Sequence, residues 1–276
     1  MASGEPNAVR WRKEPTALRL AEFLLLGVFA GAIGALTGIG GGLIITPVLT
    51  LVGGIPIHQA IGTSLCCVIA TSSGAAANYV EHRLSDIRLG MTLELATTAG
   101  AVSGALVAGL MSREALAVLF SQLLVYASAA MIRRTLRDGE TEPSETQPYK
   151  VKRLPLGLLG SAGAGIMSGL LGIGGGPVKV PLMYLVMGVP FKVATATSNF
   201  MMGVTAAASA FIYYSRGDVR LLITAPTAIG AYVGANLGTH IMRRAASRWL
   251  VLLLASIMLY LAAVMIWKSW HGGFET

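Results

Sequence analysis

The chain has 276 residues, of which 54% are hydrophobic and only 12% are charged, and its mean hydropathy is +0.67. Soluble domains carry about 25% charged residues, so this composition excludes a large soluble core and indicates a membrane protein with several spans. The formal net charge of +8 does not indicate a nucleic-acid partner, because the Lys and Arg residues lie mostly in short junctions between apolar runs.

The chain begins with a polar tail over residues 1–17. The apolar run that follows has no obvious cleavage site, which predicts a retained first helix and not a cleaved signal peptide. Five apolar segments then make up a predicted first transmembrane repeat over residues 18–135; they lie at 18–37, 43–55, 58–81, 89–111 and 115–132.

A polar linker over residues 136–153 separates this repeat from the next. Its Lys and Arg residues surround an acidic centre, and the positive-inside rule places it in the cytoplasm. The second repeat covers residues 154–268, before a C-terminal tail over 269–276, and its apolar segments lie at 155–171, 177–189, 192–214, 220–242 and 248–267.

Two of these segments, 43–55 and 177–189, are too short for a full crossing, which needs about 20 residues. Each is therefore a half-helix, either re-entrant or the second part of one bent span. The sequence as a whole predicts an all-α polytopic membrane protein with about 8–10 membrane segments.

The two groups of segments are similar to each other. The run Gly-Ile-Gly-Gly-Gly occurs at residues 38–42 and returns at 172–176, followed each time by a proline. At the same offset, Pro56 pairs with Pro190 and the Thr-Ser step at 63–64 pairs with that at 197–198. We predict an internal duplication, in which each half holds a glycine-broken helix pair and three further helices. Basic residues at segment ends slightly favour an inverted second half, whereas the basic N-terminus favours a parallel one.

The glycine runs are the first candidates for a functional site. Glycine and proline are poor helix formers, so both runs break a helix, and broken backbone persists in a membrane only inside protein or along a cavity. Helices that start after a break present free N–H groups and the positive end of their dipole to an anion. Matching breaks in two halves are typical of a transporter's substrate site. We predict that the substrate binds at Gly40, Gly41, Gly42, Gly174, Gly175 and Gly176. The alternative is that the glycines only permit close helix crossing.

Lys179 follows the second glycine run by three residues and lies deep in an apolar segment. A lysine at bilayer depth costs at least about 2.5–3.5 kcal/mol and normally faces a cavity or a partner. Beside an anion-binding helix start it would supply a cation, which its repeat partner, Ile45, does not. The alternative is a lysine whose ammonium reaches the membrane interface.

Hydroxyl and amide side chains follow the paired prolines in both halves. They can donate to the oxygens of an anion without adding charge, although Ser and Thr in membrane helices often bond only to their own backbone. The predicted substrate-binding residues of this group are Thr63, Ser64, Thr197, Ser198 and Asn199.

Two titratable residues are candidates for coupling transport to protons. Glu94 lies within an apolar segment, and a desolvated glutamate can titrate near neutral pH, although an interfacial position is the alternative. His58 lies at a helix start and is a candidate pH sensor because imidazole is the physiological-pH switch among side chains, although a role in lining the mouth of the site or a place at the interface is the alternative.

No arrangement of residues indicates an enzyme, a cofactor or a metal site. The chain has no G-x-S-x-G elbow, no H-E-x-x-H and no Walker A lysine. Its two cysteines, Cys66 and Cys67, are adjacent within an apolar run; neighbouring cysteines rarely form a relaxed disulfide, and two cannot build a zinc site alone. They are expected to be small buried residues, with a membrane sulfur relay as the alternative.

The duplicated Gly-Ile-Gly-Gly-Gly runs, the paired prolines Pro56 and Pro190, and the paired Thr-Ser steps resemble the TauE/SafE family of membrane permeases over residues 20–268. The resemblance implies a multi-pass transporter of the bacterial-type inner membrane that moves sulfur-containing anions such as sulfite or organosulfonates without ATP. We therefore expect a secondary transporter, acting as an exporter, whose site opens to each side in turn, with a passive anion channel as the alternative. The expected partners are a small anion and the lipid bilayer; the anion, the direction of transport, the coupling ion and the oligomeric state stay open.

Overall fold

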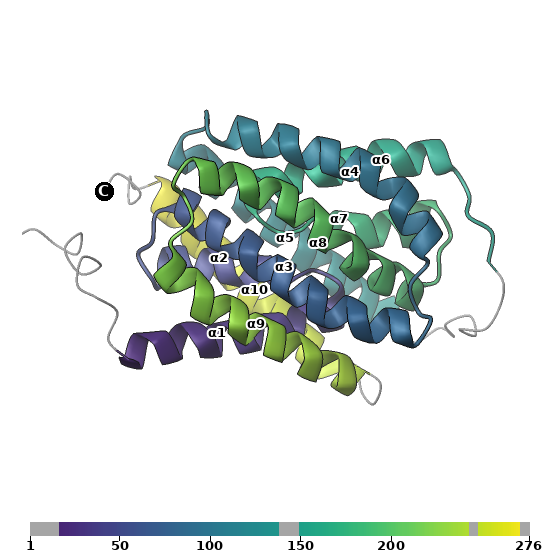
Figure 1. The fold of residues 1–276 in the computed structure, drawn as a ribbon, viewed down its shortest axis with the longest axis horizontal. Helices are drawn as coiled ribbons and strands as arrows, with labels where there is room; N and C mark the ends of the chain where they lie inside the picture. The colour runs from purple at the N-terminus through teal and green to yellow at the C-terminus, as the bar shows by residue number, and fades with distance from the viewer. Residues whose placement is uncertain (1–16, 138–148, 243–247, 271–276) are drawn as a thin grey trace, which may run out of the picture.

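The computed structural model describes residues 17–137, 149–242 and 248–270, and these residues form helices and turns without any strand (Figure 1). The first half contains α1 (Ala17–Thr37), α2 (Gly42–Leu51), α3 (Ile57–Glu81), α4 (Ile87–Ala108) and α5 (Arg113–Arg137). The second half contains α6 (Leu154–Leu171), α7 (Gly176–Pro181), the π-helical segment η1 (Leu182–Val186), α8 (Phe191–Ser215), α9 (Leu221–Met242) and α10 (Arg248–Trp270). The all-α prediction is confirmed, and the helices follow the predicted apolar segments closely.

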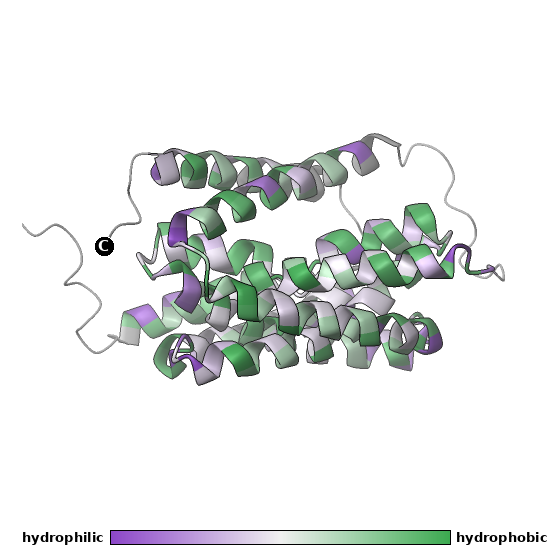
Figure 2. Cartoon of the chain, turned by 90° about the horizontal axis from the view of Figure 1, so that it is seen from above, coloured by the Kyte–Doolittle hydropathy of each residue, from purple (hydrophilic) through white to green (hydrophobic). Residues whose placement is uncertain are grey.

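Five helices of the described chain are long and apolar enough to cross a membrane, namely α1, α3, α4, α6 and α9. Figure 2 shows that strongly hydrophilic residues lie mostly near the ends of the helices, as expected when the middle of the bundle lies in lipid. The protein is therefore a multi-pass membrane protein. The predicted tail at residues 1–16, the linker centre at 138–148 and the last six residues lie outside the described residues.

The first and fourth helices of opposite halves pack side by side. In both pairs the contacting residue numbers rise together, so each pair runs parallel. Small residues make these contacts and let the backbones approach closely. Helices α1 and α9 meet at Leu24–Gly230, Val28–Gly234 and Ala32–Gly238. Helices α4 and α6 meet along two rows, one through Gly100–Ala162 and Gly104–Ile166 and the other through Thr97–Gly165 and Ala101–Gly169.

Helices α3 and α8 cross the middle of the bundle in opposite directions. Gly62, near the start of α3, packs against Asp218, just after the end of α8. At the other end, the backbone N–H of Asp86, just after α3, donates to Thr197 near the start of α8. These two helices hold equivalent places in the predicted duplication, so their directions agree with the inverted relation that the sequence slightly favours. The duplication itself stays a prediction from the sequence.

Each short helix returns the chain between two long helices that run the same way. Helices α1 and α3 both run parallel to α9, because α3 meets α9 through Thr63–Thr224 at one end and Asn78–Asn236 at the other. Helix α2 must therefore lead the chain back, and its ten residues cover about 15 Å. The segment formed by α7 and η1 does the same between α6 and α8. The half-helices are thus re-entrant.

The two last helices of the halves, α5 and α10, pack against each other. Their buried side chains, including Leu116, Phe120 and Met258, belong to the same hydrophobic cluster as those of α2 and α3. This pair therefore covers the α2 side of the central helices and leaves α7 to pack among α4, α6 and α8.

The glycine breaks tolerate almost no added side chain, which generates a first prediction. A Cβ at Gly176 would overlap the carbonyl oxygen of Gly38, whereas a Cβ at Gly163 would meet nothing within 4 Å. We expect Gly176→Ala to lower the free energy of unfolding by about 1–3 kcal/mol, as overpacking does in other cores. Gly163→Ala should be neutral or slightly stabilising. Thermal unfolding in detergent measures both, and equal melting temperatures for the two variants would contradict the tight packing of the breaks.

Candidate functional site

The two glycine breaks touch each other at the centre of the molecule. A Cβ on Gly42 would lie 2.5 Å from the carbonyl oxygen of Gly172, and one on Gly176 would overlap that of Gly38. The contact is reciprocal, since the start of each short helix packs against the end of the long helix in the other half. Glycine is required for this approach, and it also supplies the left-handed turns at Gly38, Gly40, Gly41, Gly172, Gly174 and Gly175, where φ lies between 67° and 84°.

Each break is tied to the opposite half by one serine. Ser64 on α3 donates to the carbonyl of Gly172 at 2.8 Å, and Ser198 on α8 donates to the carbonyl of Gly38 at 3.2 Å. The carbonyls at the ends of α1 and α6 thus gain a side-chain donor where no further helical turn follows. Both serines were predicted to bind substrate, and here both hold the breaks in place.

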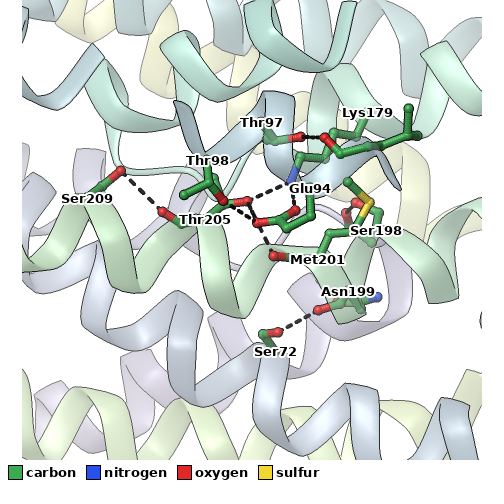
Figure 3. A network of polar contacts seen from close by, with 12 residues as sticks. Ser72, Glu94, Thr97, Thr98, Lys179, Ser198, Asn199, Met201, Thr205 and Ser209 are labelled. Atoms are coloured by element: carbon green, nitrogen blue, oxygen red, sulfur yellow. Dashed lines mark hydrogen bonds and ion pairs between the residues drawn. The ribbon is translucent and has the colours of Figure 1, made fainter. Parts of the chain in front are cut away.

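Lys179 on α7 lies against Glu94 on α4 within the protein. The Lys179 side chain is 1% exposed and that of Glu94 is 11% exposed, with Nζ 3.6 Å from Oε2 (Figure 3). The Lys179 ammonium is therefore enclosed by protein and does not reach the molecular surface, and the Glu94 carboxylate is enclosed with it. Burial of either charge alone would be costly, so the pair explains how both are retained.

Two threonines complete the cluster around the carboxylate. Lys179 Nζ donates to Thr205 Oγ1 at 2.9 Å, and Thr205 donates onward to Glu94 Oε1 at 2.6 Å. Thr98, one turn after Glu94 on α4, also donates to Oε1 at 3.0 Å. The other oxygen, Oε2, is buried and has no hydrogen-bond partner. Figure 3 shows these side chains converging from α4, α7 and α8.

Lys179 and Glu94 are the only charged side chains among the buried residues of the described chain. The matching place in the other half is neutral. The equivalent of Lys179 is Ile45, and the repeat of α4 in α9 places Thr224 opposite Glu94; Thr224 shares a hydrogen bond of 3.1 Å with Thr63. The centre of the molecule is therefore asymmetric in charge between the two halves that the sequence predicts to be duplicated.

The family model for the sulfite exporter TauE/SafE matches residues 23–265, which is most of the chain. The chain belongs to the TauE/SafE family. Relatives of the chain are named as probable membrane transporter proteins. YunE of Bacillus subtilis, a "probable membrane transporter protein", is 28% identical over 268 residues, covering 89% of this chain and 97% of that protein.

Further relatives come from other organisms. A probable membrane transporter protein of Xylella fastidiosa is 30% identical, covering 88% of this chain and 93% of that protein. MJ0441 of Methanocaldococcus jannaschii, also named a probable membrane transporter protein, is 27% identical, covering 87% and 93%. No solved structure matches the chain significantly. The protein is thus a membrane transporter of the TauE/SafE family, built around the paired breaks and one buried ion pair.

The remaining predicted substrate residues of this TauE/SafE protein lie apart from Lys179. Thr63 binds Thr224, and Asn199 donates to the carbonyls of Ala35 and Thr195. In Figure 3, Asn199 and Ser72 form a contact of their own away from the Lys179 cluster. Three predicted features therefore converge, namely the glycine breaks, Lys179 and Glu94, while the polar residues of α3 and α8 mostly fasten helices.

Thr197 lies at the end of the bundle where α3 joins α4. It accepts the backbone N–H of Asp86, whose carboxylate also caps α4 and accepts the hydroxyl of Tyr149 at 2.6 Å. Burial and the neighbouring Asp86 carboxylate raise the pKa of Tyr149, which therefore stays a hydrogen-bond donor. Thr197 thus helps to hold the turn between α3 and α4 against the start of α8.

The second coupling candidate lies away from the ion pair. His58, at the start of α3, donates from Nε2 to the carbonyl of Ala108 at 3.2 Å, at the end of α4 opposite to Asp86. It ties two helix ends together. Cys66 and Cys67 are free thiols on α3; Cys67 is buried and Cys66 is half-buried.

Sequence reasoning did not single out Thr205 and Thr98, which hold Glu94. The sequence held a signal for each. Thr98 lies four residues after Glu94, which is the spacing of neighbours on one helix face. Thr205 corresponds to Thr71 in the first half when the two glycine runs are aligned. The sequence also did not indicate that Glu94 and Lys179 would meet, because they come from different halves.

The ion pair generates a second prediction. Lys179→Met leaves a buried carboxylate without its cation, and Glu94→Gln leaves an unpaired ammonium, so each should cost about 3–5 kcal/mol of stability. The double variant removes both charges and should recover most of that loss. Melting temperatures of the four proteins in detergent form the test. If the loss of stability in the double variant equals the sum of the losses in the two single variants, the two charges do not stabilise each other.

Proposed function

We propose that this TauE/SafE protein is a secondary transporter that exports a small sulfur-containing oxyanion, such as sulfite or an organosulfonate, by alternating access. The observation that carries the proposal is the buried ammonium of Lys179 beside the touching breaks. A cation held inside a membrane protein marks an ion or substrate pathway by default, and here its neighbours are re-entrant helix starts.

The chemistry around the breaks suits an oxyanion. Several fully buried hydroxyls on the helices that meet there have no hydrogen-bond partner, namely those of Thr46, Ser168 and Thr195. Each can donate to an anion oxygen without adding charge. With Lys179 they supply donors on the helices that form the breaks, which are the kind of group that a sulfur oxyanion requires.

The helix directions support alternating access. Helices α3 and α8 are antiparallel and meet where Ser72 donates to the carbonyl of Asn199, so each end of the bundle is built from the equivalent parts of opposite halves. An arrangement of this kind gives two similar ways of opening the centre, one toward each side of the membrane. The basic residues Arg83, Arg88, Lys150 and Arg153 lie at the end where α6 begins, which we propose faces the cytoplasm.

Transport assays with Lys179 variants provide the third prediction. In proteoliposomes we expect the wild type to move radiolabelled sulfite or an organosulfonate, and we expect Lys179→Met/Glu94→Gln, which keeps the core neutral and packed, to reduce the flux at least tenfold. The exposed lysine Lys150, changed to Met, serves as the matched control and should leave flux unchanged. Wild-type flux in the double variant would remove Lys179 from the proposed site.

A counterflow experiment distinguishes a carrier from a passive anion channel built on the same breaks. Unlabelled substrate on the far side accelerates uptake of label through a carrier, because the loaded site returns faster than the empty one. A channel shows no such acceleration. We expect trans-stimulation.

A sulfur relay through the two cysteines makes a fourth, independent prediction. Adjacent residues on α3 point to different sides of the helix, which keeps the two thiols from acting together. Cys67 is also fully buried, which hinders exchange with a soluble thiol. We expect Cys66→Ala/Cys67→Ala to retain flux within about twofold of wild type, as for small buried residues. Complete loss of flux in a variant that melts like the wild type would support the relay.

A further inference from the structure

The proposed anion site has a property that its charges impose. In the described chain, the positive charge of Lys179 is already neutralised by Glu94, so an entering anion meets a centre of no net charge. If Glu94 stays ionised, the anion and the carboxylate share one ammonium in a medium that screens charge poorly, and the excess negative charge is strongly unfavourable.

The hydrogen bonds around Glu94 leave one of its oxygens able to take up a proton, which would remove the excess negative charge. Oε1 accepts from Thr205 and Thr98, whereas Oε2 is buried, unpartnered and 3.6 Å from Nζ. That separation is longer than the 2.7–2.9 Å of a charge-assisted hydrogen bond, so the ammonium is not hydrogen-bonded to Oε2. Its hydrogen bond goes to Thr205 and does not depend on a charge on Oε2. A proton on Oε2 would disturb neither bond to Oε1. It would also convert that oxygen into a donor beside the ammonium.

We propose that Glu94 takes up one proton on Oε2 whenever an anion binds at Lys179, so that protons and anions cross the membrane together in the same direction. The protonated carboxyl and the ammonium then donate side by side to the anion's oxygens. When the anion leaves, Glu94 releases the proton to the same side and pairs again with Lys179. This inference rests on the proposed anion site and adds the coupled ion and its stoichiometry, one proton per anion.

Other titratable groups do not take over this role in the described chain. Helix α6, packed along α4, contains no titratable side chain, and α8 presents Thr205 and Met201 to this region. On α4 itself, Arg88 lies six residues before Glu94 toward the bundle end. Arg216 donates to the carbonyl of Ala105, eleven residues beyond Glu94, and lies against Gly109 still further along. Among the residues that the structure describes, Lys179 is therefore the one charged group that faces the carboxylate.

Co-binding of a proton changes what drives transport. A monovalent sulfonate would cross without net charge, and a dianion such as sulfite would carry one negative charge. An inside-negative potential favours export of that single charge, while an inward proton gradient opposes it. The membrane potential therefore drives export of the dianion with its proton but not of the sulfonate with its proton. The direction of sulfonate movement is set by the sum of the sulfonate and proton gradients.

The decisive experiment, and the fifth prediction, uses ethanesulfonate, a strong-acid anion that carries no proton of its own at neutral pH. Proteoliposomes with a trapped pH indicator are given an inward gradient of radiolabelled ethanesulfonate. We expect the lumen to acidify by one proton for each anion that enters. Glu94→Gln, whose amide can still donate to the anion, should move ethanesulfonate without acidification.

A second variant guards against poor folding of Glu94→Gln. Thr98→Val removes one hydrogen bond that favours the ionised carboxylate over the protonated carboxyl, so uptake of a proton together with the anion should persist in more alkaline buffer. We expect the alkaline limb of the flux profile to move up by about one pH unit. Ser103→Ala, which removes an exposed hydroxyl from the same helix, should leave the profile unchanged.

The outcomes separate the two proposals. Ethanesulfonate entry without acidification in the wild type, or acidification that persists in Glu94→Gln, would overturn the proton coupling and leave the anion transporter standing. An unmoved pH profile in Thr98→Val would count against Glu94 as the proton site. If the wild type moves neither sulfonate nor sulfite, the proposed function fails, and the coupling fails with it.

Discussion

The structure depends on one constraint, that polar groups inside a membrane must find partners within the protein. Where the glycine runs interrupt the helices, the carbonyls of Gly38 and Gly172 receive serine hydroxyls from α8 and α3, and each break rests on the other. The same constraint brings Lys179 and Glu94 together. Interrupted backbone and buried charge are thus placed side by side, in the only region of the described chain where both are tolerated.

Much of this architecture could be predicted from the sequence. Apolar runs located the helices because lipid requires long uninterrupted stretches, and glycine with proline located the breaks because few other residues adopt such backbone. The repeat offset predicted that Lys179 would have an uncharged counterpart, and Ile45 is buried. These features are local or periodic, so a single chain is enough to read them.

Contacts between distant segments were not predictable in the same way. No local pattern indicates that Glu94 reaches Lys179 across 85 positions, or that Ser64 and Ser198 would bond to the carbonyls of Gly172 and Gly38. A hydroxyl in a membrane helix looks the same in sequence whether it serves a ligand, its own backbone or a neighbouring helix. Partner choice is decided by packing, which here follows the reciprocal contact of the two breaks.

The close pairing of α1 with α9 and of α4 with α6 has a consequence for how the molecule is assembled and how it can move. Each tight pair takes one helix from each half, so the halves are intertwined and cannot slide past one another as separate blocks. The rigid bodies of a transport cycle would each draw on both halves. A chain cut within the linker would give two fragments, neither holding a complete pair, so each would need the other during insertion in order to fold.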